Sequence, residues 1–174
     1  MKKVLLTITV VILLSGYGFA QAGNNAIAVG VSADFLLGPS YSAAYNIGFG
    51  GNVKGLYGIG DAGQATFTVA YSSFGGKSGT VFYSNQTLSL LPFLAGYRYN
   101  LPCDFYGEGQ VGLGILTEHS PSFSAYAQTD PAAAVTVGYH KMGWDIGARF
   151  YTEGDVMNQF SIRLAYGFPV KIKK

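Results

Sequence analysis

The sequence is poor in charge and in cysteine, and after its N-terminal segment it has no long apolar run. Only 11% of its 174 residues are Asp, Glu, Lys or Arg, whereas soluble globular domains contain about a quarter. A soluble surface needs more charge than this. After residue 22, no segment provides the ~20 consecutive apolar residues of a membrane-spanning helix. The single cysteine, Cys103, excludes an internal disulfide. These absences disfavour both a soluble domain and a helical membrane protein.

The N-terminal segment has the three parts of a secretory signal peptide. Residues 1–3 are basic, residues 4–14 form a core of apolar residues and threonine, and residues 15–22 are mostly small. This core is too short for a membrane anchor, which needs ~20 residues. We therefore expect residues 1–20 to be a cleaved signal peptide, with cleavage after Ala22 as the alternative, and the product to be exported.

Removal of the signal peptide leaves the chain without net charge. Of the 11 basic residues, Lys2 and Lys3 leave with the peptide, so nine basic and nine acidic residues remain. Three of these nine basic residues lie in a short tail at residues 171–174 rather than on one face of a fold. This balance argues against a basic nucleic-acid-binding domain, so we expect no nucleic-acid partner.

The chain is instead rich in aromatic residues, at 15%, and in glycine, with 25 residues. Beyond residue 25, apolar residues recur at every second position, which is the period of a β-strand. Eight such segments follow one another, at residues 27–35, 47–59, 64–72, 88–100, 105–115, 132–140, 144–152 and 159–168. Most of them are near the ~9–11 residues with which a tilted strand crosses a bilayer. Residues 23–170 are therefore predicted to form an all-β domain, an eight-stranded antiparallel up-and-down transmembrane β-barrel.

The connections between these segments alternate in length. Short turns follow the second, fourth and sixth segments, whereas longer polar loops are expected at residues 74–86 and 117–131. Outer-membrane barrels have short periplasmic turns and longer external loops, so we expect both chain ends in the periplasm. Pro92 cannot donate to a strand ladder, which predicts either a bulge or a pairing defect on one side of its strand.

A soluble, lipocalin-like ligand-binding barrel is the competing interpretation. Such a barrel would turn its apolar side chains inward and its polar side chains toward water. The second set of alternating positions should then be rich in charge. Here those positions are mainly Gly, Ala, Ser and Thr, which are too small and uncharged for a soluble surface. The membrane barrel is therefore favoured.

The few charged residues within the strands all fall on the positions opposite the apolar ones, and so should point into the lumen. An eight-stranded barrel has an interior just wide enough for side chains to fill, and an unpaired charge there is costly. We expect a structural network of paired charges; a narrow ion path lined by the same pairs is the alternative. The predicted residues are Asp34, Lys54, Arg98, Glu108, Asp145, Arg149 and Arg163.

The remaining motifs point to no chemistry. Two Gly-x-Gly-x-x-Gly stretches, at residues 58–63 and 107–112, lack the following helix that a dinucleotide site needs. His119 and Ser120 lie in an expected loop, but adjacent residues rarely reach a common substrate. His140 is expected at the opposite end of the barrel, too far from His119 for a shared metal. We expect no cofactor, no metal and no catalytic residues.

Three stretches resemble strands of the small outer-membrane β-barrel superfamily: residues 90–99, 105–109 and 164–169. The superfamily is represented by the OmpA transmembrane domain and OmpX, and the chain is similar to its Bacteroidota-type outer membrane protein β-barrel domain. The resemblance implies a location in the envelope, surrounded by outer-membrane lipid, and no shared catalytic residues. It also implies that the barrel-assembly machinery reads the last strand, with Phe168 as the terminal aromatic residue.

Together these features predict a non-enzymatic protein of the bacterial outer membrane with a structural or surface-interaction role. Aromatic residues of the two long loops are the candidate contacts for an extracellular ligand or protein, namely Phe82, Tyr83, Phe123 and Tyr126. A narrow porin-like channel is the alternative. A lipid-modifying barrel enzyme that uses His119 and Ser120 is a third hypothesis.

Overall fold

The computed structural model describes residues 25–59, 62–77, 86–120, 123–154 and 157–170. The expected signal peptide, the basic tail and the candidate loop contacts Phe82 and Tyr83 lie outside these residues.

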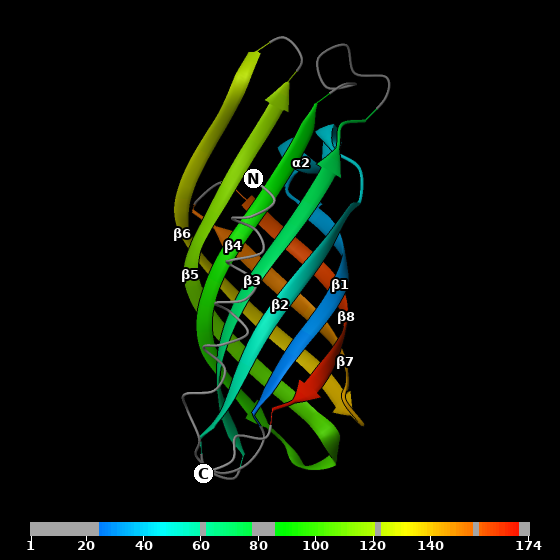
Figure 1. The fold of residues 1–174 in the computed structure, drawn as a ribbon. Coiled ribbons are helices and arrows are strands. Elements are labelled where there is room, and N and C mark those ends of the chain that lie inside the picture. Colours follow the sequence, from blue (N-terminus) through cyan, green and yellow to red (C-terminus); the bar gives the residue numbers. More distant parts are fainter. Residues whose placement is uncertain (1–24, 60–61, 78–85, 121–122, 155–156, 171–174) are drawn as a thin grey trace, which may run out of the picture.

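Eight antiparallel strands form a closed barrel, in which each strand pairs with its neighbours in sequence and the first pairs with the last (Figure 1). The predicted eight-stranded antiparallel up-and-down barrel is therefore confirmed. The strands are β1 (Ala26–Leu37), β2 (Gly48–Ile59), β3 (Gly63–Gly75), β4 (Thr87–Asn100), β5 (Phe105–Ser120), β6 (Phe123–Lys141), β7 (Trp144–Glu153) and β8 (Met157–Pro169).

The first and last strands begin and finish at the same end of the barrel, because Ala26 of β1 lies opposite Pro169 of β8. We call this the terminal end and the opposite one the loop end. A short 3-10 helix, η1 (Pro102–Asp104), lies in the connection between β4 and β5 at the terminal end.

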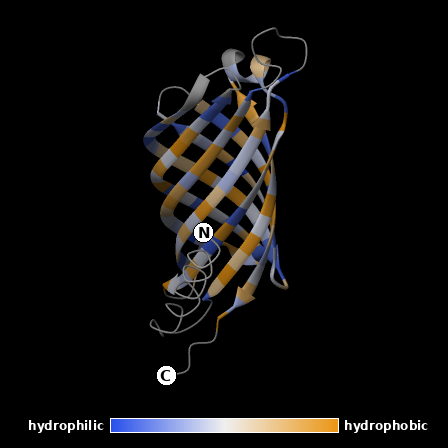
Figure 2. Ribbon diagram, turned by 45° about the horizontal axis from the view of Figure 1, so that its top comes forward, coloured by the Kyte–Doolittle hydropathy of each residue, from blue (hydrophilic) through white to orange (hydrophobic). Residues whose placement is uncertain are grey.

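The barrel wall is apolar outside and polar inside, and Figure 2 shows the two kinds of residue alternating along the strands. Large apolar side chains are exposed on every strand, such as Val31 of β1 at 62% and Phe49 of β2 at 72%. Polar and charged side chains are buried within. A lipocalin-like barrel would show the reverse, whereas an apolar exterior around a polar interior is the arrangement of a barrel surrounded by lipid.

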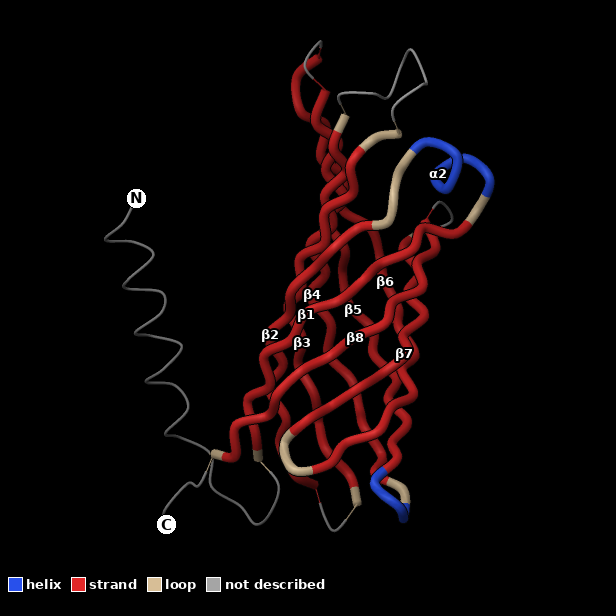
Figure 3. Tube along the Cα trace, turned by 90° about the vertical axis from the view of Figure 1, so that its right-hand side faces the viewer, coloured by secondary structure: helices blue, strands red, loops and turns tan. Residues whose placement is uncertain are grey.

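An apolar cluster fills the interior near the loop end, and we call it the apolar plug. A short helix, α2 (Pro39–Ala44), connects β1 to β2 at this end (Figure 3). The sequence analysis assigned these residues to no element, because six residues are too few for helical periodicity to be visible. No helix within the described residues is long and apolar enough to cross a membrane. The buried members of the plug are Leu36, Ala44, Tyr45, Phe74, Leu88, Leu90, Leu94, Ala132, Ala134, Tyr151 and Met157.

The predicted long loop at residues 117–131 is wrong. β5 continues to Ser120, β6 begins at Phe123, and the two strands remain paired over this region, with a bulge near the tip. Polar residues on both faces hid the alternation, since a hairpin that projects beyond the barrel has no buried face to demand it. Figures 1 and 3 show two strands projecting past the rest of the barrel at the loop end.

Pro92 produces a pairing defect on one side of its strand and no bulge. In the ladder between β3 and β4, Val69 pairs with Phe93 and Ser72 pairs with Leu90 in the same register. The two residue pairs that should lie between these are absent from the ladder. On its other side Pro92 pairs in register with Gly114 of β5. The missing amide hydrogen therefore interrupts one ladder without shifting it.

Candidate functional site

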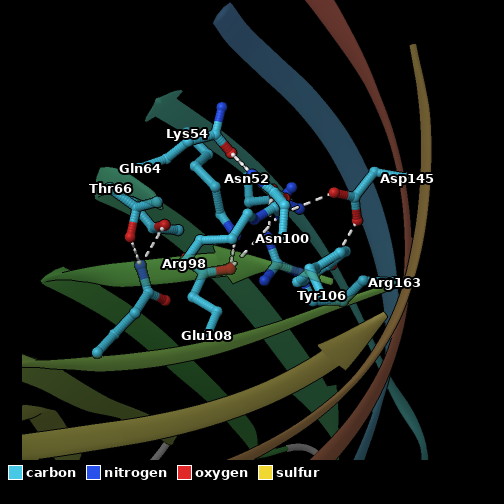
Figure 4. A network of polar contacts seen from close by, with 12 residues as sticks. Asn52, Lys54, Gln64, Thr66, Arg98, Asn100, Tyr106, Glu108, Asp145 and Arg163 are labelled. Atoms are coloured by element: carbon cyan, nitrogen blue, oxygen red, sulfur yellow. Dashed lines mark hydrogen bonds and ion pairs between the residues drawn. The ribbon is translucent and has the colours of Figure 1, made fainter. Parts of the chain in front are cut away.

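Four of the seven predicted lumen charges form a layer across the barrel interior, and we call them the charged layer (Figure 4). Lys54 of β2 donates to Glu108 of β5, with 2.5 Å between Nζ and Oε2. Arg98 of β4 donates to Asp145 of β7, with 2.7 Å between Nη2 and Oδ2, and its Nη2 lies 3.5 Å from Glu108 Oε2. All four residues are buried. Strands β2 and β5 are not neighbours, so these contacts cross the lumen and fill it.

Tyr106 of β5 completes the charged layer. Its hydroxyl donates to Asp145 Oδ1 over 2.6 Å, and the guanidinium carbon of Arg98 lies 3.6 Å from the centre of its ring. The ring lies against Gly138 and its hydroxyl against Gly147, where an added Cβ would overlap the ring or approach the hydroxyl. Arg98 is therefore held by two carboxylates and by an aromatic face.

A second set of polar residues lies beside the charged layer. Arg163 of β8 donates to Asn52 of β2, with 2.7 Å between Nη2 and Oδ1. Gln110 of β5 donates from Nε2 to Thr66 and Thr68 of β3, over 3.2 and 2.9 Å. These bonds also join strands that are not neighbours, so polar side chains bridge the interior at more than one level.

The other three predicted charges, Asp34, Arg149 and Arg163, are buried but take part in no ion pair within the described part of the chain. Asp34 accepts a hydrogen bond from Ser32 over 3.0 Å. Arg149 lies with its guanidinium carbon 5.3 Å from the ring centre of Tyr151, and its Nε and Nη2 have no hydrogen-bond partner among the described residues. The described interior therefore contains paired charges and also charges without an ion-pair partner among the described residues.

Glu153 is a buried charge that the sequence analysis missed. Its carboxylate accepts a hydrogen bond from Tyr151 over 2.6 Å, and a Cβ at Gly114 of β5 would overlap this pair. The sequence analysis ended the seventh segment at residue 152 and so left Glu153 outside it. The alternation of β7 from Asp145 through Arg149 would have found it, had the strand been extended by one residue.

At the terminal end the lumen opens into a cavity of about 410 Å³, which we call the terminal cavity. Arg98 and Asp145 of the charged layer lie at its inner side, and Gln64 and Asn100 line it and are hydrogen-bonded to each other over 3.2 Å. Cys103, which also lines the cavity, is exposed. The charged layer thus separates this cavity from the rest of the interior.

The structure does not bring the other candidate residues together. His119 is an exposed residue near the tip of β5, and His140 lies next to the turn at the opposite end of the barrel. Tyr126 is 63% exposed on β6. Phe123 begins β6, and its side chain lies outside the described part of the structure. Within the described residues, no three His, Cys, Asp or Glu side chains gather as metal ligands would.

No protein-family model and no curated protein matches the sequence. Solved structures do match it. Ail, the attachment invasion locus protein of Yersinia pestis, is 15% identical, with a TM-score of 0.62 over 85% of this chain and 100% of Ail. Neisserial surface protein A is 16% identical, with a TM-score of 0.59 over 87% of this chain and 100% of that protein.

The N-terminal β-barrel domain of OprF from Pseudomonas aeruginosa is 15% identical, with a TM-score of 0.50 over 84% of this chain and 100% of the domain. Identities this low establish a common fold and nothing about a common ligand. This chain has the fold of the small outer-membrane β-barrels.

Proposed function

We propose that this protein resides in the bacterial outer membrane, conducts no ions, and binds an extended polypeptide segment at the cell surface. The observation that carries the proposal is the long β5–β6 hairpin, which presents an unpaired strand edge above a filled barrel. The apolar exterior and the expected export signal support the location. The terminal end would face the periplasm and the loop end the cell exterior, since outer-membrane barrels carry their longer loops outside.

The filled interior supports a protein that holds its hairpin at the cell surface rather than one that transports solutes through its lumen. The charged layer closes the lumen next to the terminal cavity, and the apolar plug fills it near the loop end. Phe74 and Leu88 of the plug have no exposed surface. An ion would have to displace both groups of side chains to pass, so the structure favours anchoring over conduction.

The free edge belongs to β6. This strand has 19 residues and its neighbour β7 has 10, and the pairing of β6 with β7 begins only at Ala132. Within the described residues, the segment of β6 before Ala132 pairs with β5 alone. A strand edge of this kind offers a row of amide and carbonyl groups to an added strand.

The direction of the backbone groups can be assigned from one contact. The carbonyl oxygen of Pro131 accepts a hydrogen bond from the amide of Gly154, on the side away from β5. Because the amide and carbonyl of one strand residue point to the same side and alternate along the strand, Thr129 and Ala127 also point away from β5. Tyr126, exposed beside them, would supply an aromatic contact.

The test is selection of peptides from a random library displayed on phage, using the barrel in lipid nanodiscs. We expect extended peptides to be enriched, and expect Ala127→Pro combined with Thr129→Pro to weaken their binding at least tenfold, because proline removes the edge amides without touching the β5 ladder. The matched control, Ala127→Ser with Thr129→Ser, keeps both amides and should retain binding. Equal binding by the proline and serine variants would contradict the proposal, as would failure to enrich any peptide.

A further inference from the structure

The barrel interior holds a second, much smaller cavity, which we call the inner cavity. Its volume is about 10 Å³, the space of a single water-sized particle. Leu90 and Tyr151 of the apolar plug line it together with the polar residues Asn52, Arg149 and Arg163. It therefore lies where the plug meets the polar interior, apart from the terminal cavity.

Several residues that line this cavity have unsatisfied polar atoms. Arg149 is 5% exposed, and its Nε and Nη2 have no hydrogen-bond partner within the described residues. The same holds for Nδ2 of Asn52, whose other amide atom, Oδ1, accepts from Arg163. A buried donor without a partner costs about 1–3 kcal/mol, and more when it is charged. One acceptor on the same lining, Gln159 Oε1, also lacks a partner within the described residues. Three unsatisfied donors against one unsatisfied acceptor indicate an occupant that accepts more hydrogen bonds than it donates.

The charge around the inner cavity indicates which occupant. Two guanidinium groups, Arg149 and Arg163, and one carboxylate, Asp34, line it, so its charged residues sum to one positive charge. Within the described residues none of the three has an ion-pair partner. Two buried positive charges with a deficit of acceptors favour an anion over a neutral molecule. A cavity of about 10 Å³ favours a small, monatomic anion over a larger one.

We propose that the inner cavity binds one halide ion, chloride in the cell, held by Arg149 and Asn52 and balanced against Arg163. The site lies between the charged layer and the apolar plug, both of which are buried. The ion is therefore enclosed as the barrel forms, and its binding contributes to the stability of the closed barrel. This inference is independent of the peptide-binding role, because it concerns the interior rather than the hairpin.

The experiment measures urea unfolding of the full chain in detergent micelles, with sodium chloride or bromide against sodium gluconate at constant ionic strength. We expect the unfolding midpoint to rise with halide. Above the dissociation constant, the folding equilibrium constant should increase about tenfold for each tenfold increase in halide, as one-site binding to the folded state requires. An unchanged midpoint for the wild type would overturn the proposal.

Two variants locate the effect. Arg149→Met should abolish the halide dependence, and Asn52→Asp should also abolish it while keeping the barrel folded, because the new carboxylate replaces the anion beside the two guanidinium groups. Lys141→Met is the matched control: it removes one positive charge from an exposed pair at the terminal end and should leave the dependence unchanged. If Arg149→Met does not fold, the halide dependence of Asn52→Asp alone tests the proposal. A halide dependence that persists in Asn52→Asp would overturn the proposal.

Crystals grown in bromide give a direct readout. We expect an anomalous peak between the side chains of Arg149 and Asn52 in the wild type and none in Asn52→Asp. A water molecule at this position, with no anomalous signal, would overturn the proposal even if the unfolding midpoint rose with halide.

Discussion

Arg98 illustrates how a charge is accommodated inside a barrel of this size. It is 3% exposed, yet its guanidinium contacts Asp145, approaches Glu108 and stacks on the ring of Tyr106. Glu108 and Tyr106 come from the neighbouring strand β5 and Asp145 from β7 across the lumen, so no residue close to Arg98 in the sequence accounts for these contacts. Arg98 finds these partners only when the barrel closes. The closed barrel in turn is stable only if this buried charge is paired, because an unpaired buried charge is costly.

The pair of Lys54 and Glu108 allows a quantitative test at the residue scale. Glu108→Gln leaves the buried Lys54 ammonium without its carboxylate, so we expect a loss of about 3–5 kcal/mol in the free energy of unfolding. Lys54→Met should cost a similar amount, because Arg98, at 3.5 Å from Glu108, replaces the lysine only in part.

The double variant, Lys54→Met with Glu108→Gln, removes both charges and should be more stable than either single variant. Urea titration in micelles measures all three. Lys141→Met serves as the control, since its exposed partner Asp104 lies 3.7 Å away and such pairs contribute about 0–1 kcal/mol. Strictly additive losses in the double variant would mean that the pair is not coupled.

The identity of the inward-facing charges could be predicted from the sequence, but their partners could not. Alternation within each strand placed all seven predicted charges on the buried side, because the side-chain period of a strand is two. Which acid meets which base depends on strand tilt and stagger, which no single strand encodes. Tyr106 fell on the inward positions as well, but nothing in the sequence showed that two glycines leave space for its ring.

At the scale of the element, the β5–β6 hairpin and α2 are where sequence patterns and structure diverge. Both lie at the loop end, beyond the apolar band of the barrel. Strands there need no apolar outward face, so their residues need not alternate. The eight barrel strands, by contrast, were predicted in number and order, since each has an apolar face along most of its length. The alternation of apolar residues therefore indicates which strand residues form the apolar exterior, and not every residue that is in a strand.

The tip of the hairpin should be dispensable for folding. Replacing residues 119–125 by Asn-Gly joins Glu118 to Tyr126, which already lie opposite each other, through a favoured two-residue turn. We expect the free energy of unfolding to change by less than about 1 kcal/mol, because surface changes away from the core are usually small.

Urea titration measures the free energy of unfolding of this variant, and heat-dependent gel mobility shows whether it folds. The contrasting variant is Leu116→Asp, which places a charge against the apolar plug and should be strongly destabilising. If the shortened hairpin prevented folding, the tip would be a structural element, and the surface-display role would lose its basis.

At the scale of the whole molecule, the exterior and the interior lead to one expected behaviour. The apolar exterior requires lipid or detergent, and the filled interior leaves no aqueous path through the described residues along the barrel axis. We expect the protein to be recovered from outer membranes and to run faster on gels before heating than after it.

Planar bilayers should show no single-channel conductance for the wild type, because the charged layer and the apolar plug both block the lumen. Arg98→Ala should also remain silent, since the plug is untouched. Conductance in the wild type, or steps that appear in Arg98→Ala, would favour the narrow channel that the charge pattern left open.

The seam between β1 and β8 sets the order in which this molecule can form. Twelve residue pairs, from Ala26 with Pro169 to Leu37 with Asn158, join the first strand to the last. A nascent chain that lacks β8 therefore exposes two long unsatisfied edges at once, one on β1 and one on β7, and such edges invite aggregation. Closure must therefore await the synthesis of β8, and until then the edges of β1 and β7 have to be kept from pairing with other chains.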